Sequence, residues 1–388
     1  MKTLKLLLTL IIIAFVTVTG CKEDSRIAPD TSPLRSQPSA RQSARLSPEL
    51  KAKLDKMRAA LPADFQKRLE QQVSKLSKHQ PPYRKRTPGT LNTAESVSCD
   101  FNPPINQWLD SELANWTEEV WLHANWNVLY WLPLWSAGFS TNSENEYFGR
   151  HGEYTQLITK TSKDLKRFWG IESDQIEVVG AHGSVLRDRE ALINMYMTVL
   201  QFDEATAGST ADYILALLTA YPQFRNGDHP FLTFFTMSFG GTPSRTVIGD
   251  GVLEGFAAIG YGDVAPQVLL AHEFGHQIQI QSGQYEGNGP EFVRMQELMA
   301  SAYAAYYLSH ARGAAMQWKR VQQFLQIFYN IGDCYPDYYQ HRGTPTQQMA
   351  AAEWAYNLAN DAQKQGHILT AQEFATLFEA QLPLILQQ

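Results

Sequence analysis

The residues best suited to chemistry are His272, Glu273 and His276, which form an H-E-x-x-H sequence within the apolar stretch 266–281. If this stretch is helical, the two histidines lie one turn apart on the same face, where both imidazoles can reach one metal ion. Glu273 then lies beside that ion and can act on water without binding the metal. The alternative is a core helix that carries two histidines by chance, but burying these groups unpaired is costly. We therefore expect a zinc (Zn²⁺) site with one protein ligand still to be found.

The third ligand is expected on a second helix, predicted over residues 290–312 because a proline opens it and a glycine follows it. Glu297 is set among apolar residues of this helix, so its carboxylate should face inward and needs a partner. We choose Glu297 over Glu286 and Glu291, which lie in or beside a glycine-rich turn. The alternative for Glu297 is a salt bridge to Arg294.

The motif does not continue as in the metzincins, which require glycine and histidine where this chain has Gln279 and Ser282. The runs 265–276 and 294–301 instead resemble the gluzincins, most closely the bacterial neutral zinc metallopeptidase family. Ile331-Gly332-Asp333 and the later segment 341–348 are similar to two further motifs of that family. The resemblance covers residues 240–360. It implies a zincin-like peptidase with zinc held by two histidines and a glutamate.

Two residues near these motifs bear on activity. Ser301 stands where the family usually has an aspartate, and it is a weaker acceptor for the ring N–H of a ligand histidine. His341, in a tyrosine-rich loop, is a candidate to donate a hydrogen bond to the oxyanion of a peptide under attack. A structural role for His341 is the equal alternative.

The first 20 residues carry two lysines and then an apolar run, which is typical of a signal peptide and too short to span a membrane. The run ends in Val18-Thr19-Gly20-Cys21, which resembles a bacterial lipobox. That resemblance implies cleavage before Cys21, acylation of its side chain and a membrane-anchored protein of the bacterial cell envelope, in the outer membrane. The acidic pair after Lys22 resembles an export tag for surface lipoproteins. A plain secretory signal is the alternative.

The segment 21–46 is rich in serine, proline and arginine and predicts a flexible tether. Residues 47–98 predict an amphipathic helical extension, capped by Ser47 and broken near Pro62, followed by a linker. These helices should pack on their own domain, with a partner-binding or removable pro-segment as alternatives. Cys99 and Cys334 would share a disulfide-permissive compartment, where pairing and two free thiols are equally expected.

Six of the nine tryptophans lie between residues 101 and 135. We expect a packed core wall there, with a glycan-binding surface as the minor alternative. Helices are predicted over 154–169, 184–202, 210–221, 315–329 and 346–362, and a last one from Thr370. The run 231–239 predicts a buried strand or short helix. Residues 246–248 predict a short strand. The resemblance to the zincins implies that the edge of this strand holds an extended peptide.

A chain of 388 residues with 44% hydrophobic and 19% charged residues is typical of a globular protein. Its net charge of -6 offers no basic surface for nucleic acid. We therefore predict a mostly α (α+β) zincin-like catalytic domain over 99–388, with a small sheet and an active-site helix. Its expected function is hydrolysis of peptide bonds in peptide or protein substrates. The alternative is a non-catalytic surface lipoprotein that binds glycans or peptides and has a structural or degenerate zinc site.

Overall fold

The computed structural model describes residues 46–76, 99–140, 146–284, 287, 289–336, 338, 341–361 and 366–388. Residues 46–388 form one compact unit. The described part of the chain is mostly helical with one three-stranded sheet, which confirms the predicted α+β class. No helix in this part has the length and hydropathy needed to cross a bilayer. The predicted signal peptide and the lipobox at Cys21 lie outside the described residues.

The sheet has the strand order β1-β3-β2, with β1 at Ile176–Ala181, β2 at Thr236–Phe239 and β3 at Ser244–Gly249. β1 runs parallel to β3, whereas β2 is antiparallel to it. The prediction of a strand at 246–248 is confirmed, but its predicted edge position is wrong. Among the described residues β3 is paired on both sides, so the outer edge beside the antiparallel pair belongs to β2, whose four residues are buried. The predicted run 231–239 divides into a short 3-10 turn at Pro230–Thr233 and β2.

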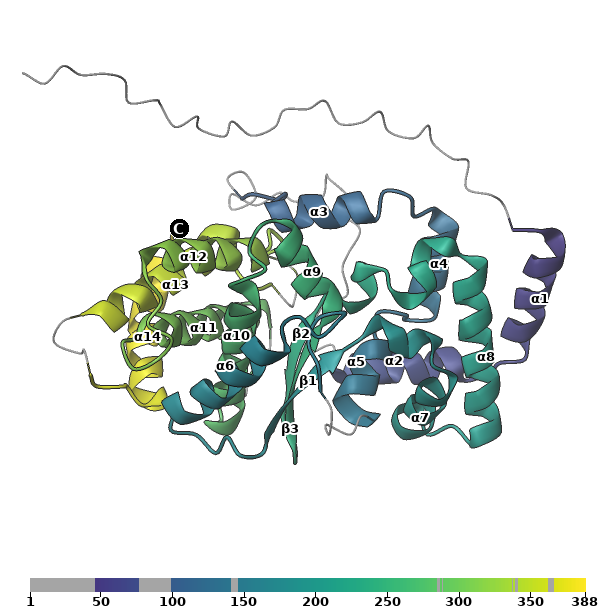
Figure 1. Cartoon of the computed structure of the whole chain (residues 1–388), viewed down its shortest axis with the longest axis horizontal. Coiled ribbons are helices and arrows are strands. Elements are labelled where there is room, and N and C mark those ends of the chain that lie inside the picture. The colour runs from purple at the N-terminus through teal and green to yellow at the C-terminus, as the bar shows by residue number, and fades with distance from the viewer. Residues whose placement is uncertain are drawn as a thin grey trace, which may run out of the picture. The chain divides into compact units, whose positions relative to one another are not determined.

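Each face of the sheet packs on its own hydrophobic core, because successive strand residues point to opposite sides. On β3, Val247 belongs to one core and Ile248 to the other. On β1, Val179 and Ile176 divide in the same way. The sheet therefore lies between two groups of helices, as Figure 1 shows.

The helices around the core that contains Ile248 form one group. They are α6 (Thr155–Phe168), α9 (Asp250–Ala258), α10 (Ala265–Gln281), α11 (Pro290–Ser309), α12 (Trp318–Ile331), α13 (Pro345–Asn360) and α14 (Ala371–Ile385). The other group holds α1 (Pro48–Ala59), α2 (Phe65–Leu76), α4 (Glu118–Trp126), α5 (Leu132–Trp135), α7 (Arg189–Leu200) and α8 (Glu204–Ala220). The helix α3 (Pro104–Glu112) contributes Ile105 to one core and Leu109 to the other.

Capping side chains set several helix starts. Ser47 caps α1 and Thr370 forms a capping box with Glu373 at α14, both as predicted. The helix predicted over 210–221 begins earlier, at Glu204, because the Asp203 side chain accepts a hydrogen bond from the Thr206 N–H. The helix predicted over 290–312 ends at Ser309.

The amino-terminal helices pack against the second group rather than standing apart. Leu54 of α1 and Phe65 and Leu69 of α2 are buried in that core. Arg68 donates a hydrogen bond to the Leu200 carbonyl at the end of α7. Of the six clustered tryptophans, three are buried and three are partly buried against the same region: Trp116, Trp131 and Trp135, then Trp108, Trp121 and Trp126.

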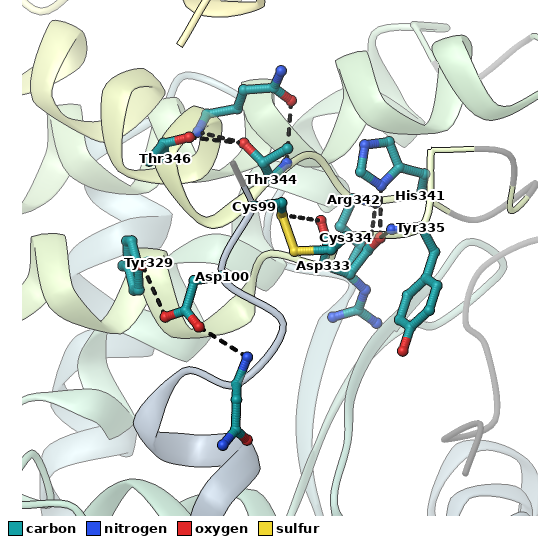
Figure 2. The surroundings of a disulfide bond; sticks show 12 residues. Cys99, Asp100, Tyr329, Asp333, Cys334, Tyr335, His341, Arg342, Thr344 and Thr346 are labelled. Carbon is teal, nitrogen blue, oxygen red and sulfur yellow. Dashed lines mark hydrogen bonds and ion pairs between the residues drawn. A yellow bond between two sulfur atoms is a disulfide. The ribbon is translucent and has the colours of Figure 1, made fainter. Parts of the chain in front are cut away.

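A disulfide joins Cys99 to Cys334, so the start of the second described segment is tied to the loop after α12 (Figure 2). The sequence separation between the two cysteines is 235 residues. A crosslink between such distant residues restricts the unfolded chain strongly, by about 5 kcal/mol at most in the loop-entropy account.

Replacing both cysteines, Cys99→Ser with Cys334→Ser, is therefore expected to lower the free energy of unfolding by about 2–5 kcal/mol. Thermal unfolding of the two proteins, each with and without reductant, measures the effect. Reductant should lower the midpoint of the unaltered protein and leave that of the double variant unchanged. Equal midpoints for the two oxidised proteins would contradict the prediction.

Candidate metal centre

The site is built where α10 and α11 cross at close range. Gly275 of α10 lies against Ala300 of α11, and a Cβ at Gly275 would fall 2.9 Å from the Ala300 Cα. Only glycine allows this approach without displacing α11. The crossing brings Glu297, one turn before Ser301 on α11, to the face of α10 that carries His272 and His276.

His272, His276 and Glu297 converge on one point with ligand atoms within 4.8 Å of one another. The Nε2 atoms of His272 and His276 lie 3.5 and 3.6 Å from the two Glu297 carboxylate oxygens. These distances are too long for good N–H···O hydrogen bonds. Two atoms bound tetrahedrally to zinc at ~2.0–2.1 Å lie about 3.4 Å apart. The three side chains therefore fit a shared metal ion better than they fit one another.

The protonation of His276 follows from its neighbour Gln279. The Gln279 Nε2 lies 2.8 Å from the Gln296 carbonyl oxygen, which can only accept a hydrogen bond. The amide oxygen of Gln279 therefore faces His276, whose Nδ1 lies 2.9 Å away. Because that oxygen also only accepts, Nδ1 carries the proton. The lone pair of the neutral ring is then on Nε2, which faces Glu297.

A longer chain of donors fixes His272 in the same tautomer. The Gln348 amide nitrogen donates to the Arg342 carbonyl at 2.6 Å, so its amide oxygen accepts from the Ser301 hydroxyl at 2.5 Å. The Ser301 oxygen then accepts from His272 Nδ1 at 3.1 Å. Ser301 thus orients His272, and Gln348 orients Ser301. Both histidines present an Nε2 lone pair to the same point.

Ser301→Ala is expected to lower zinc affinity by about 10–100-fold, because the His272 Nδ1–H loses its acceptor. Competition with a chromophoric chelator measures the change. Ser309→Ala is the matched control, since Ser309 is buried on the same helix and its hydroxyl has no hydrogen-bond partner among the described residues. Equal zinc affinity of the two variants would show that Ser301 does not orient His272.

The charge state of Glu297 also suits a ligand. Burial alone raises the pKa of this carboxyl, but the opposing effect of the positive charge of Arg342 helps to hold the pKa below its ordinary value. Glu297 is thus ionised at neutral pH. Its Oε2 has no hydrogen-bond partner among the described residues, which is costly unless a cation binds there. The alternative salt bridge to Arg294 is not formed in the structure, where Arg294 pairs with Glu291.

Glu273 is held by β2 rather than by the three convergent side chains. Its Oε1 accepts a hydrogen bond from the Thr236 hydroxyl at 2.5 Å, and its carbonyl accepts one from the Ser238 hydroxyl at 2.9 Å. The other carboxylate oxygen, Oε2, is buried and has no partner among the described residues. One oxygen is therefore anchored while the other is free to take a proton.

His341 is buried in the loop that follows α12. Its Nδ1 lies 2.6 Å from a carboxylate oxygen of Asp333, while its Nε2 has no partner among the described residues. The other oxygen of Asp333 accepts from the Arg342 N–H at 2.7 Å. Asp333 therefore joins the two motifs at 331–333 and 341–348. The role predicted for His341 at an oxyanion stays a prediction.

Sequence reasoning missed the residues that orient the site. They come from segments far from the H-E-x-x-H helix, and a threonine, a glutamine or an arginine does not by itself indicate a role at a metal site. These residues are Thr236, Gln348 and Arg342. Comparisons with protein-family models, curated proteins and solved structures find no match to this chain. The case for a function therefore rests on the geometry of the site.

Proposed function

We propose that this protein is a zinc-dependent, zincin-like peptidase. The observation that carries the proposal is the pair of 3.5 and 3.6 Å distances from two imidazole Nε2 atoms to the Glu297 oxygens. Both imidazoles have their Nδ1 atoms hydrogen-bonded elsewhere, so their Nε2 atoms face one carboxylate. Two histidines and a carboxylate form a donor set that is typical of catalytic zinc.

Bound zinc supplies Lewis acidity that polarises a carbonyl and makes water more acidic. The chain's own residues supply the proton handling. Glu273 takes a proton from the attacking water on its free Oε2 while Thr236 keeps its Oε1 in place. Glu273 then delivers that proton to the leaving amine. His341 is the proposed additional donor to the oxyanion through its Nε2, a role that requires the doubly protonated ring because Asp333 already accepts from Nδ1.

The outer edge of β2 is the proposed docking line for the substrate backbone. β2 carries Thr236 and Ser238, both bonded to Glu273, so a peptide paired with this edge passes beside the general base. The docking of an extended peptide, which we expected at residues 246–248, is thus proposed for β2 instead. The lipobox supports a further proposal, that acylated Cys21 anchors the protein in the bacterial cell envelope.

The first test is the metal. Protein lacking residues 1–21, purified without added metal, is expected to contain about one zinc ion per chain by elemental mass spectrometry. It should hydrolyse an unfolded protein, stop when a chelator is added and recover when zinc is returned. A protein that takes up no zinc, or one whose hydrolysis ignores the chelator, contradicts the proposal.

A further inference from the structure

A cavity of about 250 Å³ lies beside Glu273. Thr236, whose hydroxyl holds the Glu273 carboxylate, forms part of its wall. Leu269, one helical turn before Glu273 on α10, forms another part. None of the three metal-binding side chains lines it. A group bound in the cavity is therefore next to the general base without occupying the metal position.

Most of the wall is apolar. Ile105, Phe234, Val252 and Phe256 line it together with Leu269. Sites for drug-sized ligands occupy about 300–1,000 Å³, so this cavity has room for one large side chain and little more. Its lining favours an aliphatic or aromatic side chain, whose burial there removes apolar surface from water.

Both acidic side chains in the wall are already satisfied. The Asp100 oxygens accept hydrogen bonds from the Asn102 N–H and the Tyr329 hydroxyl, each at 2.9 Å. The Asp333 oxygens are bonded to His341 and to the Arg342 N–H, as described above. Each carboxylate oxygen in the wall therefore already has a hydrogen-bond partner.

Arg342 is different, because its guanidinium has no ion-pair or hydrogen-bond partner within the described part of the chain. Its backbone N–H is bonded to Asp333 and its carbonyl to Gln348, while its charge acts on Glu297. Figure 2 shows the guanidinium on the opposite side of the loop from the His341 imidazole. Arg342 lines the cavity. The guanidinium therefore has donors to spare in this wall, and its planar shape matches a carboxylate.

We propose that the cavity binds the carboxyl-terminal residue of a peptide, with a large apolar side chain against Phe234 and Phe256 and the terminal carboxylate on Arg342. Binding depends on the cavity alone. Cleavage of the preceding bond rests on the proposed peptidase function and consumes one water molecule. Its hydroxyl completes the new carboxyl group, and its proton passes through Glu273 to the amine of the released amino acid.

The binding test uses the purified full chain and three probes: N-acetyl-L-phenylalanine, its amide and N-acetylglycine. Ligand-observed NMR titration should give about tenfold tighter binding of N-acetyl-L-phenylalanine than of the amide, because only the acid pairs with Arg342. N-acetylglycine, which lacks the side chain, should bind weakest. The same order is expected with and without zinc.

Arg342→Gln should remove the difference between the acid and the amide. The variant should fold, since the bonds of residue 342 to its neighbours are made by its backbone. Arg320→Gln is the matched control: Arg320 is on α12, pairs with Asp263 and does not line the cavity. It should keep the tenfold preference. Val252→Phe, which fills the cavity, should weaken both phenylalanine probes.

Equal binding of the acid and the amide by the unaltered protein would overturn the carboxylate assignment. A preference that persists in Arg342→Gln would overturn the role of Arg342. Binding as expected in a protein that takes up no zinc would support the cavity and refute the peptidase. In a zinc-loaded, active protein, release of free phenylalanine from a peptide acid but not from its amide supports the proposal, and equal cleavage of both refutes it.

Discussion

Glu273→Gln is expected to lower the rate of peptide hydrolysis by about 10²–10⁴-fold while the protein still binds about one zinc ion. Glutamine keeps the shape of the side chain and can still accept the Thr236 hydrogen bond through its amide oxygen. It cannot take a proton from water. The three ligands are unchanged, so loss of activity with retained metal separates proton transfer from metal binding.

The measurement combines zinc content with initial rates on one peptide. Glu291→Gln is the control for the substitution itself, because Glu291 lies on the exposed side of α11 and pairs with Arg294. It should keep both the zinc and the rate. A Glu273→Gln protein with normal folding and full chelator-sensitive activity would exclude Glu273 as the base.

Glu297→Gln is expected to weaken zinc binding by more than about 100-fold, beyond the effect of losing an outer partner of a ligand. The amide oxygen carries no charge, so the ion loses its anionic ligand. The substitution also removes a carboxylate whose pKa is lowered in the folded protein, so the metal-free protein should lose some stability at neutral pH. Chelator competition and thermal unfolding in excess chelator test the two statements separately.

The control again compares neighbours on one helix. Glu291→Gln should bind zinc as tightly as the unaltered protein, since Glu291 is exposed and lies outside the convergent group. If Glu297→Gln kept its zinc and Glu291→Gln lost it, the ligand would have been assigned to the wrong carboxylate. If both kept it, zinc would be held elsewhere.

The convergent group was largely predictable from the sequence. The spacing of His272 and His276 places them on one helical face, and the apolar neighbours of Glu297 turn it inward. The starts of α1 and α14 were predictable because Ser47 and Thr370 each cap a helix by accepting a hydrogen bond from an N–H three residues later. These features depend on local periodicity and capping, which a sequence records directly.

What was missed depends on pairing between distant segments. β1 was not predicted, since Glu177 and Gly180 interrupt its apolar pattern. The central place of β3 depends on strand partners that its own residues do not specify. Gln348 orients Ser301 from 47 positions away. The sequence does not show that the Arg342 guanidinium lies in the cavity wall with donors to spare, because this depends on the partners that Asp100 and Asp333 find elsewhere.

The burial of Leu54, Phe65 and Leu69 has a consequence for proteolytic shedding. A protease that cuts between residues 77 and 98 breaks the chain but leaves α1 and α2 packed on the core. The fragments should remain associated, so the cut alone does not release residues 99–388 from whatever holds the amino terminus. Release of residues 99–388 would require that α1 and α2 detach from the core, or that the chain is also cut before Leu46.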